Sequence, residues 1–291
     1  MISRWLNAAT VGRNRQANRR YPQCRDGGAL VTVTDRDAAV SAARAAGEVL
    51  LRYWNTRDTI TPSRKGAGDF VSDADVEAEK SLRENLLSER PGDGWLGEES
   101  GEVSGTSRRW IVDPLDGTTN FLRGIPHWAV SVALEEDGEL VLGVIHDPVK
   151  GETFQATRGE GAWMNGTPLV GSSTETMSDA LFGTGLPFGA MAHIDDHAED
   201  LRRLLPQCAG MRRMGSAALD LAYVAAGRLD GFWERKLQLW DIAAGLVIAR
   251  EAGLRVEGWT AEEAPEESGS VVTSNPALFT TFAGIIRGQN H

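Results

Sequence analysis

The feature that most constrains the fold of this chain is a short apolar run that ends in two carboxylates. The run 110–112 (Trp-Ile-Val) predicts a buried strand, which delivers Asp113 to its end, where a loop can form a site. Pro114 fixes its own φ angle and has no backbone N–H, so we expect a turn there. That turn would bring Asp116 back beside Asp113, with the carbonyl of Leu115 on the same side.

This segment has the chemistry of a site for a divalent cation and a phosphate. Two carboxylates and a carbonyl form an all-oxygen ligand set, which suits Mg²⁺ better than zinc. Asp113 and Asp116 would repel each other without a cation between them. Gly117 has no side chain, so a phosphate can approach the backbone there, and the N–H groups of Gly117 and Thr118 could hold its oxygens.

Two further acidic segments stand apart from ordinary surface charge. Glu98 and Glu99 lie in one of them, and Asp241 lies on an apolar helix in the other. Taken singly, each has a simpler interpretation. The two glutamates could belong to a solvated loop before Gly101, and Asp241 could be a helix-capping residue.

Hydrophobic periodicity predicts a layered α+β architecture without internal repeats. A helix pair comes first, antiparallel strands follow, and strands and helices then alternate. Ser72 and Asp75 have the spacing of a capping box at the start of the second helix. Strands 129–134 and 140–146 form a hairpin signal around 135–139, with a loop slightly longer than the tightest. The other predicted elements are helices 37–54, 72–90, 216–227, 240–253 and one from Pro276, and strands 152–157, 229–233 and 271–274.

Composition excludes several classes of function. The chain has 291 residues and a net charge of −11, which argues against direct nucleic-acid binding and suits cation-assisted binding of an anion. No apolar stretch is long enough for a membrane span. The two cysteines, Cys24 and Cys208, have neither zinc nor C-x-x-C spacing. A reducing cytoplasm is therefore the expected location.

The first 30 residues differ from the rest of the chain. They contain six arginines and one acidic residue, so the remainder carries a net charge of −16. We expect residues 1–34 to be a disordered, solvated extension and residues 35–291 to be the functional domain. An organelle-targeting segment and a start codon placed too far upstream are the alternatives.

Four segments in order carry a family resemblance that covers roughly residues 37–285. They are GEES (97–100), WIVDPLDGTTNF (110–121), GSAALDLAYVAAGRLDGFWE (215–234) and WDIAAG (240–245). The chain resembles the inositol monophosphatases, within the lithium-sensitive, magnesium-dependent phosphatase superfamily. The resemblance implies a five-layered α-β-α-β-α sandwich that assembles as a homodimer. It also implies that Li⁺ competes with Mg²⁺ at the second metal site.

The resemblance further implies two or three Mg²⁺ ions per active site and a role for each matched residue. Thr118, polarised by Glu98, would help to orient and activate a metal-bound water, and a loosely held third ion would lie near Glu98. Gly117 and Thr118 would hold the phosphate. The first ion would be held by Glu98, Asp113 and the Leu115 carbonyl, the second by Asp113, Asp116 and Asp241, and the alcohol part of the substrate by Gly215, Ser216, Ala217 and Glu234.

We therefore expect Mg²⁺-dependent hydrolysis of a small phosphorylated polyol, with myo-inositol monophosphate as the first candidate. Gln238 stands where some animal members of the family have histidine, which leaves the substrate open. A sister phosphatase for histidinol phosphate, a nucleotide 3′-phosphate or a sugar bisphosphate is one alternative, and a regulatory or RNA-processing-associated protein with the same fold is another. His193 and His197 could bind a metal but are better explained as a solvated helix start.

Overall fold

A computed structural model describes residues 34–57, 63–66, 69–71, 73–186 and 193–289 of the chain. Apart from Thr34, the predicted extension lies outside these residues. Ser72 of the predicted capping box lies outside them as well.

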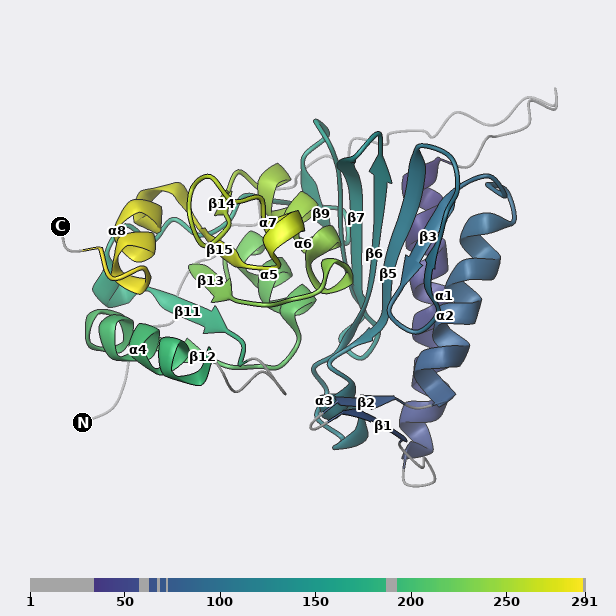
Figure 1. The fold of residues 1–291 in the computed structure, drawn as a ribbon, viewed down its shortest axis with the longest axis horizontal. Coiled ribbons are helices and arrows are strands. Elements are labelled where there is room, and N and C mark those ends of the chain that lie inside the picture. The colour runs from purple at the N-terminus through teal and green to yellow at the C-terminus, as the bar shows by residue number, and fades with distance from the viewer. Residues whose placement is uncertain (1–33, 58–62, 67–68, 72, 187–192, 290–291) are drawn as a thin grey trace, which may run out of the picture. The chain divides into compact units, whose positions relative to one another are not determined.

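Five layers of helix and sheet build the described fold (Figure 1). Helices α1 (Asp35–Asn55) and α2 (Asp73–Leu87) cover one face of an eight-stranded sheet. Helices α5 (Ala217–Ala225) and α6 (Leu239–Glu251) pack on its other face, and α5 also contacts a five-stranded sheet. Helices α4 (Ile194–Leu204) and α8 (Pro276–Ile286) form the fifth layer. The predicted α-β-α-β-α sandwich is confirmed.

The eight-stranded sheet is mixed, and its order places β3 beside β5 in parallel. Its strands, from edge to edge, are β10 (Thr167–Leu169), β9 (Ala162–Met164), β8 (Glu152–Thr157), β7 (Glu139–Asp147), β6 (Ala129–Glu136), β5 (Arg108–Asp116), β3 (Gly94–Gly97) and β4 (Gly101–Val103). The five-stranded sheet runs β12 (Gly210–Arg212), β11 (Leu181–Thr184), β13 (Gly231–Glu234), β15 (Val271–Ser274) and β14 (Arg255–Glu257). Shorter elements are the pair β1 (Ser63–Gly66) and β2 (Asp69–Val71), helices α3 (Thr118–Leu122) and α7 (Pro265–Ser268), and 3-10 turns η2 (Met177–Asp179) and η4 (Leu205–Gln207).

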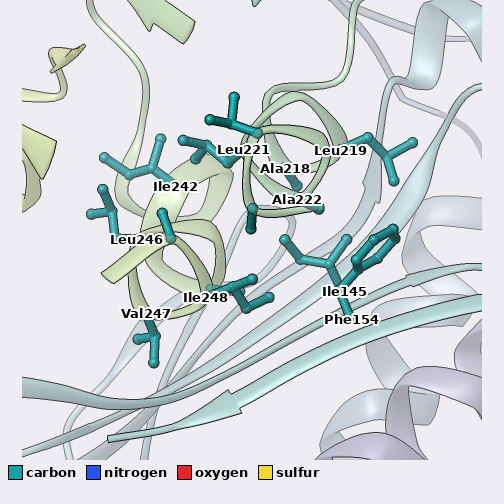
Figure 2. Close-up of a cluster of buried hydrophobic side chains, with 14 of the residues drawn as sticks. Ile145, Phe154, Ala218, Leu219, Leu221, Ala222, Ile242, Leu246, Val247 and Ile248 are labelled. Atoms are coloured by element: carbon teal, nitrogen blue, oxygen red, sulfur yellow. The ribbon is translucent and has the colours of Figure 1, made fainter. Parts of the chain in front are cut away.

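The central layer is held by close packing of small residues. Figure 2 shows Ile145 and Phe154 of the large sheet facing the apolar side chains of α5 and α6. A methyl group on Gly245 of α6 would lie 2.5 Å from Leu221 Cδ1 of α5, closer than packed atoms allow. The two helices can therefore approach each other only because residue 245 has no side chain. This fixes α5 and α6, whose first turns both reach the candidate site.

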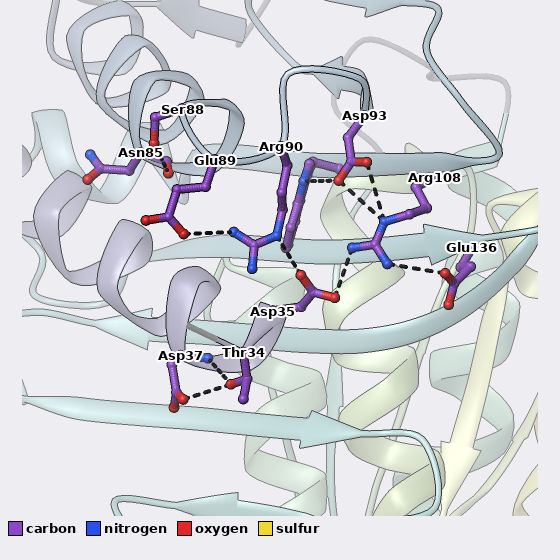
Figure 3. A network of polar contacts seen from close by, with 11 residues as sticks. Thr34, Asp35, Asp37, Asn85, Ser88, Glu89, Arg90, Asp93, Arg108 and Glu136 are labelled. Carbon is purple, nitrogen blue, oxygen red and sulfur yellow. Dashed lines mark hydrogen bonds and ion pairs between the residues drawn. The ribbon is translucent and has the colours of Figure 1, made fainter. Parts of the chain in front are cut away.

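A polar network fastens the outer helices to the large sheet (Figure 3). Arg108, at the start of β5, binds Asp35 of α1 at 2.8 Å and Glu136 of β6 at 3.1 Å. Arg90, just after α2, binds the other oxygen of Asp35 at 2.5 Å. The network fixes the end of β5 that lies away from the site, while the site itself forms at the other end.

The expected turn at Pro114 is wrong, because β5 continues to Asp116. Asp113 pairs with Ser131 and Asp116 pairs with Ala129, so β5 has one more residue than β6 between these pairs and forms a bulge. Pro114 has no N–H for the ladder, and the N–H of Leu115 bonds to Asp113 Oδ1 at 2.9 Å. The bulge, rather than a turn, brings both carboxylates to one cavity.

The hairpin loop between β6 and β7 is shorter than predicted. It consists of Asp137 and Gly138, with φ angles of 51° and 81°. Two successive positive φ values are what the tightest hairpin turn requires, and Asp-Gly is a sequence that adopts them. The other predicted helices and strands are confirmed, with boundaries that move by no more than a few residues.

Candidate active site

All but one of the predicted site residues line a single cavity of about 340 Å³. They come from the turn after β3, the end of β5, the start of α3, the start of α5, the end of β13 and the start of α6. The predicted residues that line it are Glu98, Asp113, Leu115, Asp116, Gly117, Thr118, Gly215, Ala217, Glu234 and Asp241. Ser216 does not line the cavity; it is buried directly behind Asp116.

Glu98 reaches Asp113 through the parallel pairing of β3 with β5. Gly97 pairs with Val112, and the N–H of Glu98 bonds to the carbonyl of Val112 at 3.3 Å. The turn that follows is held by Glu79 of α2, a buried carboxylate. Its two oxygens accept the N–H groups of Glu99 at 2.8 Å and Ser100 at 2.9 Å. The first acidic segment is therefore an anchored turn and not a solvated loop.

Asp116 is held by the first turn of α5. The Ser216 hydroxyl donates to Asp116 Oδ2 at 2.6 Å, and the N–H of Ala218 donates to the same oxygen at 2.7 Å. Ser216 also caps α5, because its Oγ accepts the N–H of Leu219. The GSAA segment therefore orients a predicted metal ligand as well as bordering the cavity.

Asp241 is both a capping residue and a cavity residue. Its Oδ2 accepts the N–H of Gln238 at 2.7 Å, which completes a capping box at the start of α6. The same residue lines the cavity. The capping interpretation is thus correct, and it fixes the orientation in which Asp241 faces the other carboxylates.

The four carboxylates form a cluster with unfavourable electrostatics in the protein alone. Burial raises the pKa of Asp113 well above its usual range, and the charges of Glu98, Asp116 and Asp241 raise it further. Burial also raises the pKa of Asp116 to about 6, although hydrogen bonds from Ser216 and Ala218 oppose this. The pKa of Asp241 is raised by burial and then by Asp116. A cation in the cavity would stabilise the ionised form of all three carboxylates and lower their pKa values.

The donor set fits a hard divalent cation. Four carboxylates and the carbonyl of Leu115 are the oxygen ligands that Mg²⁺ prefers. Within the described residues, no three carboxylate, imidazole or thiol groups already surround one point closely enough to hold an ion. The carboxylates line one cavity, and their negative charges favour binding of a cation. Their oxygen atoms are not yet close enough together to coordinate one.

Thr118 has a partner that sequence reasoning missed. Its hydroxyl lies 3.1 Å from the carbonyl of Leu115 and 3.4 Å from Oδ1 of Asp75, a buried residue of α2. In the sequence Asp75 has the position of a capping acid, and no local spacing shows that α2 and α3 meet. The predicted action of Glu98 on Thr118 stays a prediction, and Asp75 is an additional acceptor for this hydroxyl.

Gly117 has the conformation that its predicted role requires. Its φ is 96°, and it caps the N-terminus of α3. A side chain there would be strained, and its Cβ would lie 3.1 Å from the carbonyl oxygen of His127. Residue 117 therefore exposes backbone without a side chain at the cavity wall. Gln238, which the sequence indicated as bearing on the substrate, also lines the cavity. The lining residues that sequence reasoning missed are Thr119, Asn120, Gly185, Leu186, Arg213, Asp220, Leu237 and Trp240.

The sequence model of the inositol monophosphatase family matches residues 33–290 of this chain. The chain belongs to the inositol monophosphatase family. Members of this family generally depend on metal ions, and the carboxylate cavity offers oxygen ligands of the kind such ions bind. The predicted five-layered architecture and the phosphatase class both agree with this membership.

Individual relatives support the same assignment. An inositol-1-monophosphatase of Rhizobium meliloti (strain 1021) is 47% identical over 254 residues, which cover 85% of this chain and 94% of the relative. The Nus factor SuhB of Escherichia coli (strain K12) is 41% identical over 253 residues, covering 86% and 95%. The chain is therefore a phosphatase of this family, and its relatives include proteins with two different names.

Solved structures agree with the fold. The extragenic suppressor protein SuhB from Bartonella henselae has a TM-score of 0.84 at 42% identity, covering 86% of this chain and 97% of that one. The Thermotoga maritima IMPase has a TM-score of 0.79 at 32% identity, covering 87% and 96%.

Two remaining sequence expectations concern histidines and membranes. His193 caps the start of α4, as expected, but His197 is buried and stacks on Trp233 at 6.1 Å between ring centroids instead of facing solvent. No helix in the described part of the chain is long and apolar enough to cross a membrane.

Proposed function

We propose that this phosphatase hydrolyses a small phosphorylated polyol, myo-inositol monophosphate in the first place, with Mg²⁺ as its cofactor. The observation that carries the proposal is the cluster of four carboxylates around one cavity, namely the buried Asp113 and the half-buried Glu98, Asp116 and Asp241. Bound Mg²⁺ would lower the pKa of water, neutralise phosphate charge and stabilise the departing alkoxide. The name of the Rhizobium relative supports inositol phosphate as the substrate.

The protein residues would orient these components. One oxygen each of Asp113, Asp116 and Asp241 is fixed by a backbone or hydroxyl donor, so the three carboxylates enter the cavity in set directions. Glu98, Asp113 and the Leu115 carbonyl would hold the first ion, and the three aspartates would hold the second. A third ion would lie near Glu98.

Thr118 and Asp75 would accept the proton that the attacking water loses. The Thr118 hydroxyl has one proton. It can donate this proton to Asp75 in place of the nearer Leu115 carbonyl once that carbonyl holds the first ion, and its lone pairs can accept a hydrogen bond from water in the cavity. This arrangement moves a proton from water toward the Asp75 carboxylate. Glu98, which the family resemblance implies as the group that polarises Thr118, would assist from the side of the cavity that holds the first ion.

Recognition of the two halves of the substrate would be separate. The backbone N–H groups of Gly117 and Thr118 would contact the phosphate. Gly215, Ala217 and Glu234 line the part of the cavity that would take the alcohol, with Ser216 acting through Asp116. We also propose, from the family resemblance, that the protein is a cytoplasmic homodimer and that Li⁺ competes with Mg²⁺ at the second site.

A regulatory role is the second candidate, because relatives of 41–42% identity carry the name Nus factor. The net charge of −11 disfavours direct nucleic-acid binding but is compatible with a protein partner. Comparing the cellular role of the wild type with that of an inactive Asp113→Asn variant would separate the two. A role that survives the substitution does not depend on catalysis.

The test of the proposed substrate is phosphate release from a panel of monoesters with Mg²⁺. The panel should contain myo-inositol 1-phosphate, glucitol 6-phosphate, histidinol phosphate, adenosine 3′-phosphate and p-nitrophenyl phosphate. The proposal predicts the highest kcat/KM for inositol phosphate. A clear preference for histidinol phosphate or the nucleotide would overturn the substrate assignment and leave the reaction class intact.

A further inference from the structure

A buried carboxyl group outside the predicted metal set faces the same cavity. Asp220 of α5 is 1% exposed and lines the cavity, and its Oδ1 has no hydrogen-bond partner among the described residues. A buried polar atom without a hydrogen-bond partner destabilises the folded protein. A bound ligand that pairs with Asp220 Oδ1 would remove this cost. None of the roles described above uses it.

The position of Asp220 on α5 directs it away from the large sheet and toward Gly183 of β11. Its neighbours in the helix, Leu219 and Leu221, belong to the packed cluster between the helices and the large sheet (Figure 2). Asp220 follows Ser216 by four residues, so both lie on one face of the helix. Ser216 bonds to Asp116, and that face is therefore the one turned toward the predicted site.

Asp220 and Glu234 converge on the end of β11. A methyl group on Gly183 would lie 3.7 Å from Asp220 Cγ, and one on Gly185 would lie 1.9 Å from Glu234 Oε2. Gly183 lies in β11 and Gly185 follows its last residue, Thr184, so the end of β11 and the residue after it border both carboxyl groups. Gly185 has no side chain, and this absence leaves the space in which Glu234 lies.

The charges around the pair favour a partner that can both give and accept hydrogen bonds. Burial raises the pKa of Asp220 well above its usual range, Glu234 and Asp116 raise it further, and Arg213 lowers it. Burial likewise raises the pKa of Glu234 to about 8. A hydroxyl group can pair with a carboxyl in either protonation state, since it is both donor and acceptor.

We propose that Asp220 is a specificity-determining residue that hydrogen-bonds a hydroxyl of the substrate's alcohol part, next to the hydroxyl that Glu234 contacts. The substrate class is then a phosphate monoester of a polyol with at least two further hydroxyls within reach of this wall. The inference rests on the proposed function, because it assumes that the cavity takes the alcohol on the side of Glu234. It assigns to Asp220 the partner that its Oδ1 lacks within the described residues.

The test compares wild type, Asp220→Ala and Asp220→Asn on myo-inositol 1-phosphate, glucitol 6-phosphate and p-nitrophenyl phosphate. Asp220→Ala should lower kcat/KM for the preferred polyol phosphate by roughly tenfold to a hundredfold, the scale of one hydrogen bond to a charged or strongly polar group. Asp220→Asn keeps the volume and one acceptor, so its loss should be smaller. Both variants should stay within about threefold of wild type on p-nitrophenyl phosphate, which offers no hydroxyl. Glu234→Gln should show the same split.

Product inhibition provides a second measurement of alcohol binding, and it does not require turnover of the polyol phosphate. With p-nitrophenyl phosphate as the substrate, Asp220→Asn should weaken inhibition by free myo-inositol and leave inhibition by inorganic phosphate unchanged. Equal losses on all substrates, or no loss on any, would overturn the role of Asp220. If wild type prefers glucitol 6-phosphate to inositol phosphate, the proposed substrate fails, and the same comparison on glucitol 6-phosphate still decides the role of Asp220.

Discussion

Gly97 leaves open the space that the carboxylate of Glu79 occupies. A methyl group at residue 97 would lie 2.6 Å from Glu79 Oε1, well inside van der Waals contact. Glu79 in turn holds the N–H groups of Glu99 and Ser100, so this contact sets the turn in which Glu98 lies. The predicted metal ligand Glu98 thus depends on the glycine that precedes it and on a buried acid of α2.

Substitution of Gly97 should therefore impair catalysis through Glu98. Gly97→Ala should displace Glu79, lower the melting temperature and reduce kcat by roughly tenfold or more, because small misplacements of catalytic groups are costly. Raising the Mg²⁺ concentration should recover part of the loss if Glu98 has become a weaker ligand. Steady-state kinetics across a Mg²⁺ series checks this. Gly210→Ala is the control for the added methyl group, because residue 210 lies in a strand without a positive φ and its Cβ would meet other atoms only at 3.5 Å, an ordinary contact distance.

Thr118 and Asp75 should act as a pair. Thr118→Ala and Asp75→Asn should each lower kcat by roughly a hundredfold, the scale of general-base assistance, with little change in KM. Thr118→Ser retains the hydroxyl and should keep most of the activity. The double variant Thr118→Ala/Asp75→Asn should be no worse than either single variant, since both changes break one relay. Fully additive losses would show that the two residues act separately.

Glu234 should make stability depend on pH. Burial raises its pKa to about 8 in the folded protein, above the ordinary value of 4.5. The folded state therefore binds the proton more tightly than the unfolded state, and the stability from this group is full below the unfolded pKa and is lost as the pH rises through the folded pKa. At constant Mg²⁺, the melting temperature of wild type should fall between about pH 5 and about pH 9. Glu234→Gln cannot titrate, so its melting temperature should fall less steeply with pH than that of wild type. Identical slopes for the two proteins would show that the pKa of Glu234 is not raised by burial.

The Arg-rich start of the chain should be dispensable for catalysis. The family match begins at residue 33, and the described fold begins with Thr34, whose hydroxyl accepts the N–H of Asp37 at 3.1 Å and caps α1. A chain shortened to begin at Val33 keeps this cap. It should match the full-length chain in melting temperature and kcat, measured by thermal denaturation and phosphate release. A loss in either quantity would assign a structural or functional role to the first 32 residues.

The sequence predicted those features of the fold that depend on local pattern. Helix α1 has one apolar stripe, and β15 and the start of α8 are marked by an apolar run followed by Pro276, so periodicity and turn chemistry located them. The bulge in β5 could not be predicted in the same way. Whether Pro114 starts a turn or a bulge depends on the pairing of β5 with Ser131 and Ala129 of β6, which is a non-local contact.

In the candidate site, too, residues marked by the local sequence were predicted and residues placed by non-local contacts were not. The local sequence indicated Asp113 and Asp116 as metal ligands, whereas Glu98 and Asp241 were assigned only through the family resemblance, and the cavity brings all four together. Asp75 and Asp220 were not predicted as site residues. Each lies in an ordinary helical sequence, and each reaches the cavity region only through contacts between elements far apart in the chain.

The most direct test of the account is Mg²⁺-dependent phosphate release from myo-inositol 1-phosphate by wild type and Asp113→Asn. Asp179→Asn, at an exposed position outside the cavity, is the matched control. Chelator should abolish the activity of wild type, Mg²⁺ should restore it, and Asp113→Asn should remain folded but lose several orders of magnitude in kcat, because it lacks a ligand shared by both proposed ions. Activity that persists in chelator, or an Asp113→Asn variant as active as the control, would contradict the proposed metal site.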